Sequence, residues 1–304
     1  MKVEIKGNCL SGDYSRLEVS TSDRFRLLLH EDSQSPTSIP LDIDNIIVDK
    51  HLVSIGQEHR VNVVEHLFSA LYGMNLFNVR IDVFSDEIPF FDGSSQDFVE
   101  LLQDIFPLSL RSASGGEAIS LFNANIKDCP VPKTESVDSR GVNKTRNDEK
   151  PYFFRNRCNL LRFNKKLLVE QSESFILYEP LKKDKLLVEM ELTHPFIETQ
   201  RITLEVNKET YIKEIAPART FAFVNEDDPR LKNLPAYGIG ITKNNIYSKE
   251  PLRFQNELVR HKILDLLGDL YVLKKKLVGK IICKNTSHQL NLRFVRKLVL
   301  DFIK

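Results

Sequence analysis

Residues 254–276 read FQNELVRHKILDLLGDLYVLKKK, and the fold that we expect is organised around this stretch. It is predicted to form one long helix, whose broad apolar face carries Ile263, Leu264, Leu266, Leu267, Leu270 and Tyr271. On the remaining arc, His261, Asp265 and Asp269 follow one another at intervals of four residues, so their side chains lie one turn apart on the same side. A helix this apolar is expected to be mostly buried.

The polar row on this helix can be interpreted in two ways. One imidazole and two carboxylates are costly to bury unless something pairs with them. A bound divalent cation would do so. The alternative is a helix exposed on one side, in which His261 and Asp265 form an ordinary polar pair, and the helix taken alone favours this alternative.

Composition limits the class of protein. A chain of 304 residues is long enough for two domains, and its 43 basic and 42 acidic side chains nearly cancel, which argues against a dedicated nucleic-acid-binding protein. Cys9, Cys129, Cys158 and Cys283 form no C-x-x-C pair, so we expect a reducing compartment and no cysteine metal cage. The start of the chain lacks the apolar segment of a signal peptide, and no apolar run approaches the ~20 residues of a membrane span, so we expect a cytosolic protein.

Two segments of similar element order are predicted, joined by a flexible connection. In the first, Asn62 with Glu65 three residues later predicts a capping box at a helix start, and Ser94 or Ser95 predicts the start of a second helix. The predicted strands are residues 17–19, 25–29, 78–84, 160–163, 166–169, 174–178, 186–192, 201–206 and 277–283. The other predicted segments are a turn-rich stretch at 32–40, a flexible connection or insertion at 127–157, a short helix at 209–215 and a last helix opened by 285–288.

Several short sequence words occur together in a characteristic order. They are VEHLFSAL at 64–71, EIP at 87–89 with DGS at 92–94, ARTF at 218–221, VRHKILD at 259–265 with GDLY at 268–271, and SH at 287–288. With these words the sequence resembles the UDP-3-O-acyl-N-acetylglucosamine deacetylases of lipid A synthesis, the LpxC family. Each word alone is weak, but together they are specific and cover most of the chain.

The chain also departs from the family's pattern. Residues 7–12 match the family's opening G-x-G-L-H-x-G only loosely and lack its histidine, and Val63 stands where the family usually has threonine. The glycine-rich loop after ARTF is shortened to residues 238–245, Ser287 replaces a glycine, and residues 127–157 have no clear counterpart. These departures bear on substrate affinity and acyl-chain preference, and they leave the metal-ligating set intact.

The resemblance implies a zinc amidase. Zn²⁺ would be held by His66, His261 and Asp265, a set of two nitrogens and one oxygen that suits a catalytic zinc site with a position left for water. Glu65 would be the general base that takes a proton from this water. The substrate would be acylated UDP-N-acetylglucosamine, and acetate would leave.

Further roles follow from the same resemblance. His288 would be the general acid or a cationic stabiliser of the oxyanion, and Asp269 would orient it. Thr220 would donate a hydrogen bond to the oxyanion. Lys262 would contact the diphosphate or nucleotide sugar, and Phe221 would pack on the sugar or nucleotide.

The family's fold is α+β, with two similar domains in which helices pack on a β-sheet layer and the helical layers face each other across the active site. The first domain, residues 1–112, would carry Glu65 and His66. The second, residues 113–304, would carry the other two ligands and His288. An apolar passage for the acyl chain is expected within the second domain, at residues 186–206, with Leu187, Val188, Phe196 and Ile197 in its wall. A peripheral membrane contact is left open, and we expect a monomer.

The sequence also leaves alternatives to these roles. Glu65 could only cap its helix, which would exclude the catalytic role because one carboxylate cannot face both the Asn62 amide and the metal. His66 could be a packed core residue, and His288 a surface residue at a helix start. The whole chain could be a homologue that binds the nucleotide lipid or a protein partner without turnover, or a nucleic-acid-binding module, although its near-neutral charge weighs against the last.

Overall fold

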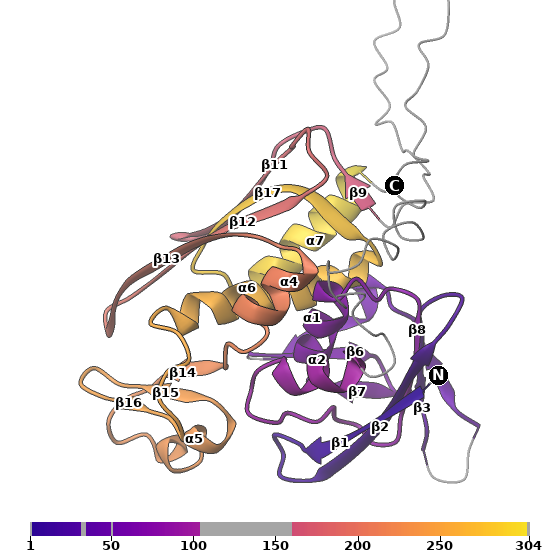
Figure 1. Cartoon of the computed structure of the whole chain (residues 1–304), viewed down its shortest axis with the longest axis horizontal. Helices are drawn as coiled ribbons and strands as arrows, with labels where there is room; N and C mark the ends of the chain where they lie inside the picture. The colour runs from indigo at the N-terminus through magenta and orange to yellow at the C-terminus, as the bar shows by residue number, and fades with distance from the viewer. Residues whose placement is uncertain (1, 32–34, 50, 104–159, 303–304) are drawn as a thin grey trace, which may run out of the picture.

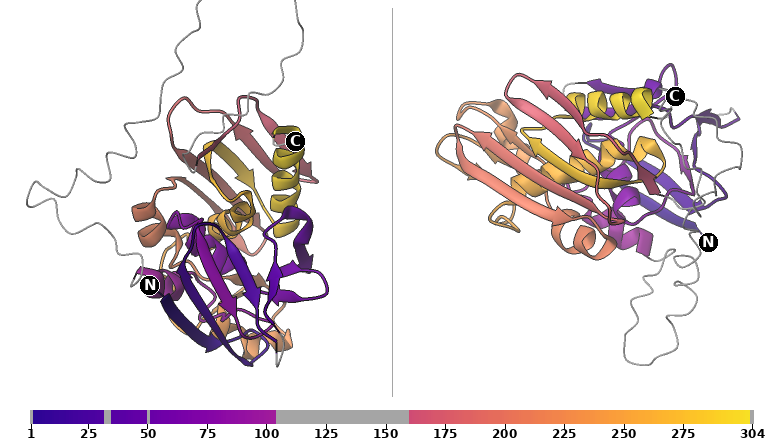
Figure 2. Two further views of the ribbon diagram at one scale, coloured as in Figure 1. Left: turned by 90° about the vertical axis from the view of Figure 1, so that its right-hand side faces the viewer. Right: turned by 90° about the horizontal axis from the view of Figure 1, so that it is seen from above.

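Two large β-sheets form outer layers, and the main helices lie between them (Figure 1). The computed structural model describes residues 2–31, 35–49, 51–103 and 160–302. Helices α1 (Glu65–Gly73) and α2 (Gln96–Gln103) lie near the first sheet, whereas α6 (Glu257–Leu270) and α7 (His288–Phe302) lie near the second. Two further views separate the indigo and purple strands of the first sheet from the red-to-yellow strands of the second (Figure 2). The predicted α+β class is confirmed.

The first sheet has five strands in the order β1-β2-β8-β3-β4. Their bounds are β1 (Lys2–Asn8), β2 (Tyr14–Thr21), β8 (Val79–Val83), β3 (Arg26–Leu29) and β4 (Thr37–Ile39). Alternate residues of β2 are buried, including Leu17 and Val19, as expected for a sheet with one face on the core. The predicted strands at 17–19, 25–29 and 78–84 are confirmed. The turn-rich prediction for 32–40 was too broad, because β4 lies within it.

The second sheet has six strands, with β17 (Lys276–Lys284) at its centre. The path is β10-β11-β17-β12-β13, and β9 also pairs with β17. Their bounds are β9 (Leu160–Arg162), β10 (Leu167–Gln171), β11 (Ser174–Glu179), β12 (Leu186–His194) and β13 (Ile197–Glu205). All six overlap predicted strands, but β13 begins four residues before the predicted segment 201–206. Leu186, Val188 and Met190 of β12 are fully buried and supply the inward face.

Two small three-stranded sheets were not predicted from the sequence. One follows the 3₁₀ helix η1 (Ile43–Asn45) and consists of β5 (Ile46–Asp49), β6 (Leu52–Gly56) and β7 (Arg60–Asn62). The other consists of β14 (Phe221–Phe223), β15 (Ile239–Ile241) and β16 (Ile246–Tyr247), with η3 (Pro229–Lys232) and α5 (Leu234–Tyr237) between β14 and β15. Both flank the site described below.

The helix expected at 254–276 is shorter in the structure. It comprises α6 and the 3₁₀ turn η4 (Tyr271–Leu273), and the chain then turns at Lys274, whose φ of 56° is left-handed. The short helix expected at 209–215 is confirmed as α4 (Lys208–Thr210), capped by Asn207, followed by the π-helical turn η2 (Tyr211–Ile215).

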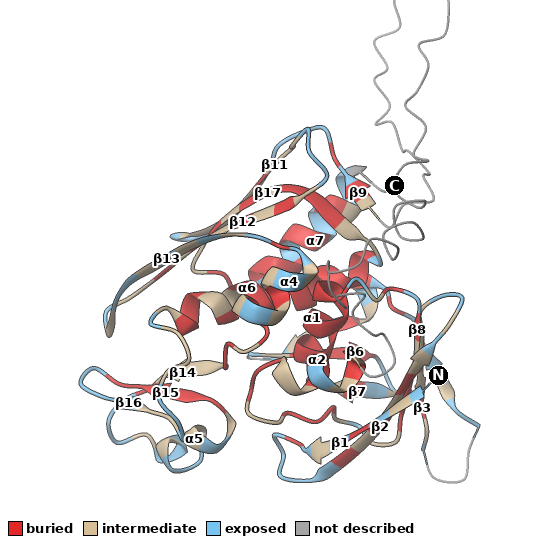
Figure 3. Cartoon of the chain, in the orientation of Figure 1, coloured by how far each residue is buried: buried red, intermediate tan, exposed pale blue. Residues whose placement is uncertain are grey.

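Helix α1 lies at the centre of the molecule, and every one of its residues is buried (Figure 3). It packs against α6, where a Cβ on Gly268 would lie 2.3 Å from the carbonyl oxygen of Glu65. At its other end, a Cβ on Gly73 would lie 2.1 Å from the ring of Tyr211, whose hydroxyl donates to Ser69 Oγ (3.0 Å). Glycine therefore permits the close approach at both ends of α1.

One continuous hydrophobic core joins the two layers. The Tyr271 hydroxyl donates to the carbonyl oxygen of Leu76 (2.7 Å), and the Leu277 amide donates to the Tyr72 hydroxyl (2.9 Å). These bonds link segments far apart in the sequence. The expected domain boundary at 112–113 and the expected connection at 127–157 lie outside the described residues.

Within the described ranges, no helix combines the length and the apolar character needed to cross a membrane. Cys9 and Cys283 are buried free thiols, and the other two cysteines lie outside the described residues.

Candidate active site

Three potential metal ligands converge where α1 meets α6. His66 lies on α1, and His261 and Asp265 lie one turn apart on α6. Each offers one donor atom, and these atoms all lie within 4.8 Å of one another. The imidazole rings of His66 and His261 are 5.3 Å apart, and His261 Nε2 lies 3.1 Å from Asp265 Oδ1. All three side chains are buried, so they form an enclosed cluster and not a chance grouping of exposed side chains.

The surroundings of the two histidines suit metal coordination. Burial, with a smaller contribution from His261, lowers the pKa of His66 to about 3, so its imidazole is neutral. His66 Nδ1 is buried and has no hydrogen-bond partner among the described residues, and coordination to a cation would satisfy it. His261 Nδ1 lies 3.0 Å from the carbonyl oxygen of Ala218, which can only accept, so Nδ1 carries a proton and Nε2 points towards Asp265 Oδ1.

Asp265 supplies the negative charge of the cluster. Burial alone would raise its pKa, but the charges of His261, Lys262 and His288 outweigh burial and hold the pKa well below its usual range. Two imidazoles and one carboxylate form the donor set of a catalytic zinc site with three protein ligands. The residues present therefore fit a zinc ion.

Glu65 is the first residue of α1 and does not cap it. The predicted capping box is wrong. Asn62 is the last residue of β7, and its Oδ1 accepts a hydrogen bond from Ser54 Oγ (2.8 Å). The N-cap of the helix is Val64, which makes no side-chain hydrogen bond to the helix. One carboxylate oxygen of Glu65 accepts from the Val53 amide (3.2 Å). Burial raises the pKa of Glu65 to about 7, although the charge of His288 opposes this rise. A carboxylate poised in this range suits a general base.

The turn before α1 sets the direction of Glu65 and His66. Val63 has a φ of 62°, in the left-handed region that a β-branched residue rarely adopts. Its side chain is buried. This residue lies between β7 and α1, and the first turn of α1 packs against α6 at Gly268.

His288 and Asp269 form a second buried pair beside the cluster. His288 opens α7, and its Nδ1 lies 2.8 Å from Asp269 Oδ2. Burial alone would lower the pKa of His288, but the carboxylates of Asp269 and Asp265 outweigh burial and raise it to about 9. His288 Nε2 lies 3.9 Å from Asp265 Oδ1, so a cationic imidazole faces the three ligands.

Lys262, Phe221 and Thr220 lie at one side of the cluster. Lys262 Nζ is 3.0 Å from Asp265 Oδ2 and 5.4 Å from the centre of the Phe221 ring. The Phe221 ring is in turn 6.1 Å from that of His261. The half-buried Thr220 donates its backbone N–H to the Gly93 carbonyl oxygen (2.7 Å), so the words ARTF and DGS meet here.

Comparison with known proteins identifies the family. The family of UDP-3-O-acyl N-acetylglycosamine deacetylases, LpxC, matches residues 2–113 and 135–300 of the chain. The chain belongs to this family. Among relatives named UDP-3-O-acyl-N-acetylglucosamine deacetylase, that of Acidithiobacillus ferrooxidans is 30% identical over 264 residues, which cover 84% of this chain and 72% of the relative. That of Campylobacter hominis is 28% identical over 297 residues, which cover 95% of this chain and 86% of the relative.

A buried ion pair in this LpxC-family chain was not predicted from the sequence. Arg219 Nε lies 2.8 Å from Glu257 Oε1, which also accepts from the Arg219 amide (3.0 Å). This pair fixes the segment whose Ala218 carbonyl contacts His261. The signal that could have found it is the place of Arg219 within the word ARTF.

His51 and Asn291 also lie near the site. For His51, in the turn between β5 and β6, the sequence indicates only a surface or structural residue. Partial burial and the charges of Lys262 and His288 lower its pKa, which places this turn close to the site. Asn291 on α7 donates to Asp269 (2.8 Å). Neither residue belongs to a sequence word that points to a function.

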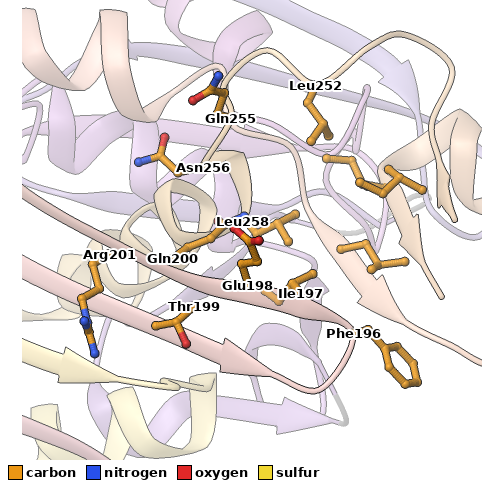
Figure 4. Close-up of a pocket in the computed structure, with 13 residues that line it drawn as sticks. Phe196, Ile197, Glu198, Thr199, Gln200, Arg201, Leu252, Gln255, Asn256 and Leu258 are labelled. Atoms are coloured by element: carbon orange, nitrogen blue, oxygen red, sulfur yellow. The ribbon is translucent and has the colours of Figure 1, made fainter. Parts of the chain in front are cut away.

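A pocket of about 620 Å³ opens between β13, the small β14–β16 sheet and the start of α6 (Figure 4). Polar residues of β13 and the segment before α6 form part of its wall, and its apolar lining is Phe196, Ile197, Ile239, Ile241, Ile246, Leu252 and Leu258. Phe196 and Ile197 lie here as expected for the wall of an apolar passage. Leu187 and Val188 do not line this pocket. Val188 is fully buried in the core.

Alanine at Gly268 is expected to disturb the metal cluster as well as the packing. The added Cβ would meet the Glu65 main chain, so α1 and its ligand His66 must move away from α6. Overpacking of this kind costs about 1–3 kcal/mol. Thermal unfolding and bound metal per chain measure the two effects. The matched control is Gly73→Ala, which meets the Tyr211 ring at the far end of α1 and should lower stability while retaining more metal. Equal metal loss in both variants would contradict this role of Gly268.

Proposed function

We propose that this protein is a zinc-dependent deacetylase that removes the N-acetyl group of UDP-3-O-acyl-N-acetylglucosamine in lipid A biosynthesis and releases acetate. The observation that carries the proposal is the convergence of His66, His261 and Asp265 beside Glu65 and His288. Membership of the LpxC family and the names of the relatives support the substrate.

His66, His261 and Asp265 would hold the zinc ion. When bound, zinc would polarise the acetamide carbonyl and lower the pKa of the attacking water towards ~7. The carbonyl oxygen of Ala218 keeps His261 in the tautomer that presents Nε2. Lys262 neutralises part of the charge of Asp265 and remains at the edge of the site.

Proton transfer falls to Glu65 and His288. Glu65 takes a proton from the water as the water oxygen bonds to the carbonyl carbon. The cationic imidazole of His288 first stabilises the developing oxyanion and then donates its proton to the departing nitrogen as the carbon–nitrogen bond breaks. Acetate and a free amine result, and Asp269 holds His288 in place throughout. The Thr220 hydroxyl would add a hydrogen bond to the oxyanion.

The rest of the substrate would lie around these groups. Lys262 would contact the diphosphate or nucleotide sugar, and Phe221 would pack against the sugar or nucleotide, since the two side chains lie together next to His261. The pocket beyond β15 would take the acyl chain against the apolar part of its wall, and β15 pairs with β14, which begins at Phe221.

The remaining expectations from the sequence are proposals as well. We propose an N-terminal domain of residues 1–112 and a C-terminal domain of residues 113–304. We further propose a cytoplasmic monomer that takes up its lipid substrate through at most a peripheral contact with the membrane. The division into two sheets, each with its own helices, supports the first of these proposals.

Zinc analysis combined with a deacetylation assay tests the function. The purified protein is expected to hold about one zinc per chain and to release acetate from the acylated UDP-sugar. A chelator should abolish this activity, and added zinc should restore it. Zinc binding without turnover would favour a homologue that binds the nucleotide lipid or a protein partner, and absence of zinc would contradict the proposal.

A further inference from the structure

Asn291 lies on α7 three residues after His288, on the same face of the helix. Its side chain is fully buried, and Nδ2 donates to Asp269 Oδ2 (2.8 Å). The same oxygen lies 2.8 Å from His288 Nδ1. The first turn of α7 thus directs two N–H donors to a single carboxylate oxygen.

Packing does not explain an asparagine at this position. Asn291 Oδ1 is buried without a hydrogen-bond partner among the described residues, and so is Asp269 Oδ1. An unsatisfied buried polar group lowers stability, whereas leucine has the same branching and no polar atom to leave unsatisfied. The asparagine therefore contributes something other than stability.

Its contribution is the orientation of the Asp269 carboxylate. The terminal torsion of an aspartate is broad and roughly two-fold, so a carboxylate held by one donor at one oxygen can rotate. The second donor, from Asn291, removes this freedom because both N–H groups come from one rigid helical turn. His288 Nε2 is then kept facing Asp265 at 3.9 Å.

We propose that Asn291 is a positioning residue for the deacetylation, fixing the His288 imidazole through Asp269 in the orientation that delivers a proton to the departing amine. This inference rests on the proposed function.

Asn291→Leu tests the inference, since it keeps the branching of the side chain and removes the donor, although its methyl groups are bulkier than the amide. We expect kcat to fall roughly ten- to a hundredfold, the range seen when an outer partner of a functional histidine is lost. KM should change little because Asn291 lies behind Asp269 and not in the pocket. Bound metal should stay close to that of the wild type, and any fall in the melting temperature should be no larger than that of the hydrogen-bond control described below.

A double-mutant cycle with Asp269→Ala separates positioning from a general structural effect. If Asn291 acts only through Asp269, adding Asn291→Leu to Asp269→Ala should lower kcat by less than about twofold, because interacting sites are not additive. The matched control is Tyr178→Phe, which removes another buried hydrogen bond, to the Val278 carbonyl oxygen (2.7 Å), within the second sheet. This control should melt at a lower temperature than the wild type and keep its kcat.

The outcomes are distinguishable. An active wild type with an equally active Asn291→Leu variant would overturn the role of Asn291 and leave the deacetylase intact. The role of Asn291 would also be overturned if the effects of Asn291→Leu and Asp269→Ala on kcat were fully additive, or if kcat fell only in proportion to a loss of stability. A wild type that binds zinc without deacetylating would overturn the proposed function and this inference with it.

Discussion

Glu65→Gln is expected to lower kcat by roughly 10²- to 10⁴-fold, the usual contribution of a general base, while zinc stays bound. Glutamine has the same shape, and its carbonyl oxygen can still accept the hydrogen bond from the Val53 amide, so α1 should keep its position. What the variant loses is the ability to take a proton. Steady-state kinetics with zinc analysis on the same samples measures both quantities.

The control for Glu65→Gln is a conservative change at an exposed carboxylate, and Glu100→Gln on α2 is suitable. It should leave kcat and zinc content unchanged. Retention of wild-type kcat by Glu65→Gln would remove Glu65 from the mechanism. Loss of zinc together with activity would instead show that Glu65 acts by supporting the ligands.

His261→Ala is expected to lower zinc affinity by roughly a hundredfold or more, because even the loss of a partner behind a ligand costs roughly ten- to a hundredfold. The variant removes one of two nitrogen donors and leaves Asp265 buried without its 3.1 Å neighbour. Since a ligand that binds only the folded protein stabilises it, the wild type should melt at a lower temperature after chelation. The melting temperature of His261→Ala should respond little to a chelator.

His30→Ala is the matched control for this experiment. His30 pairs with Asp82 at 2.7 Å on the first sheet, away from the cluster. It should retain the zinc content and the chelator response of the wild type. The metal assignment would be wrong if His261→Ala bound zinc as tightly as the control.

The sequence predicted more of the regular structure than of the site's detail. The strands of both large sheets and the main helices carry clear apolar periodicity. The small sheets consist of strands of two to five residues, such as Phe221–Phe223, and periodicity cannot be read from segments this short.

The candidate site shows the same division. The residues that converge could be named because they occur in specific words such as VEHL and RHKILD. The capping box at Asn62 and Glu65 was predicted wrongly because nothing in the sequence signals a left-handed valine between them. Asn291 was missed because a single amide in an amphipathic helix resembles an exposed polar residue, and only the tertiary packing buries it.

The left-handed conformation of Val63 affects how destabilising substitutions elsewhere in the protein would change activity. A backbone conformation of this kind stores about 1–3 kcal/mol, and burial of a valine side chain returns about 1.5–3 kcal/mol. The conformation of Val63 is therefore maintained by the packing around it and not by the preference of the residue itself. Substitutions that weaken the packing of the neighbouring core should allow Val63 to leave this conformation first. Activity should then be lost at temperatures where most of the chain is still folded.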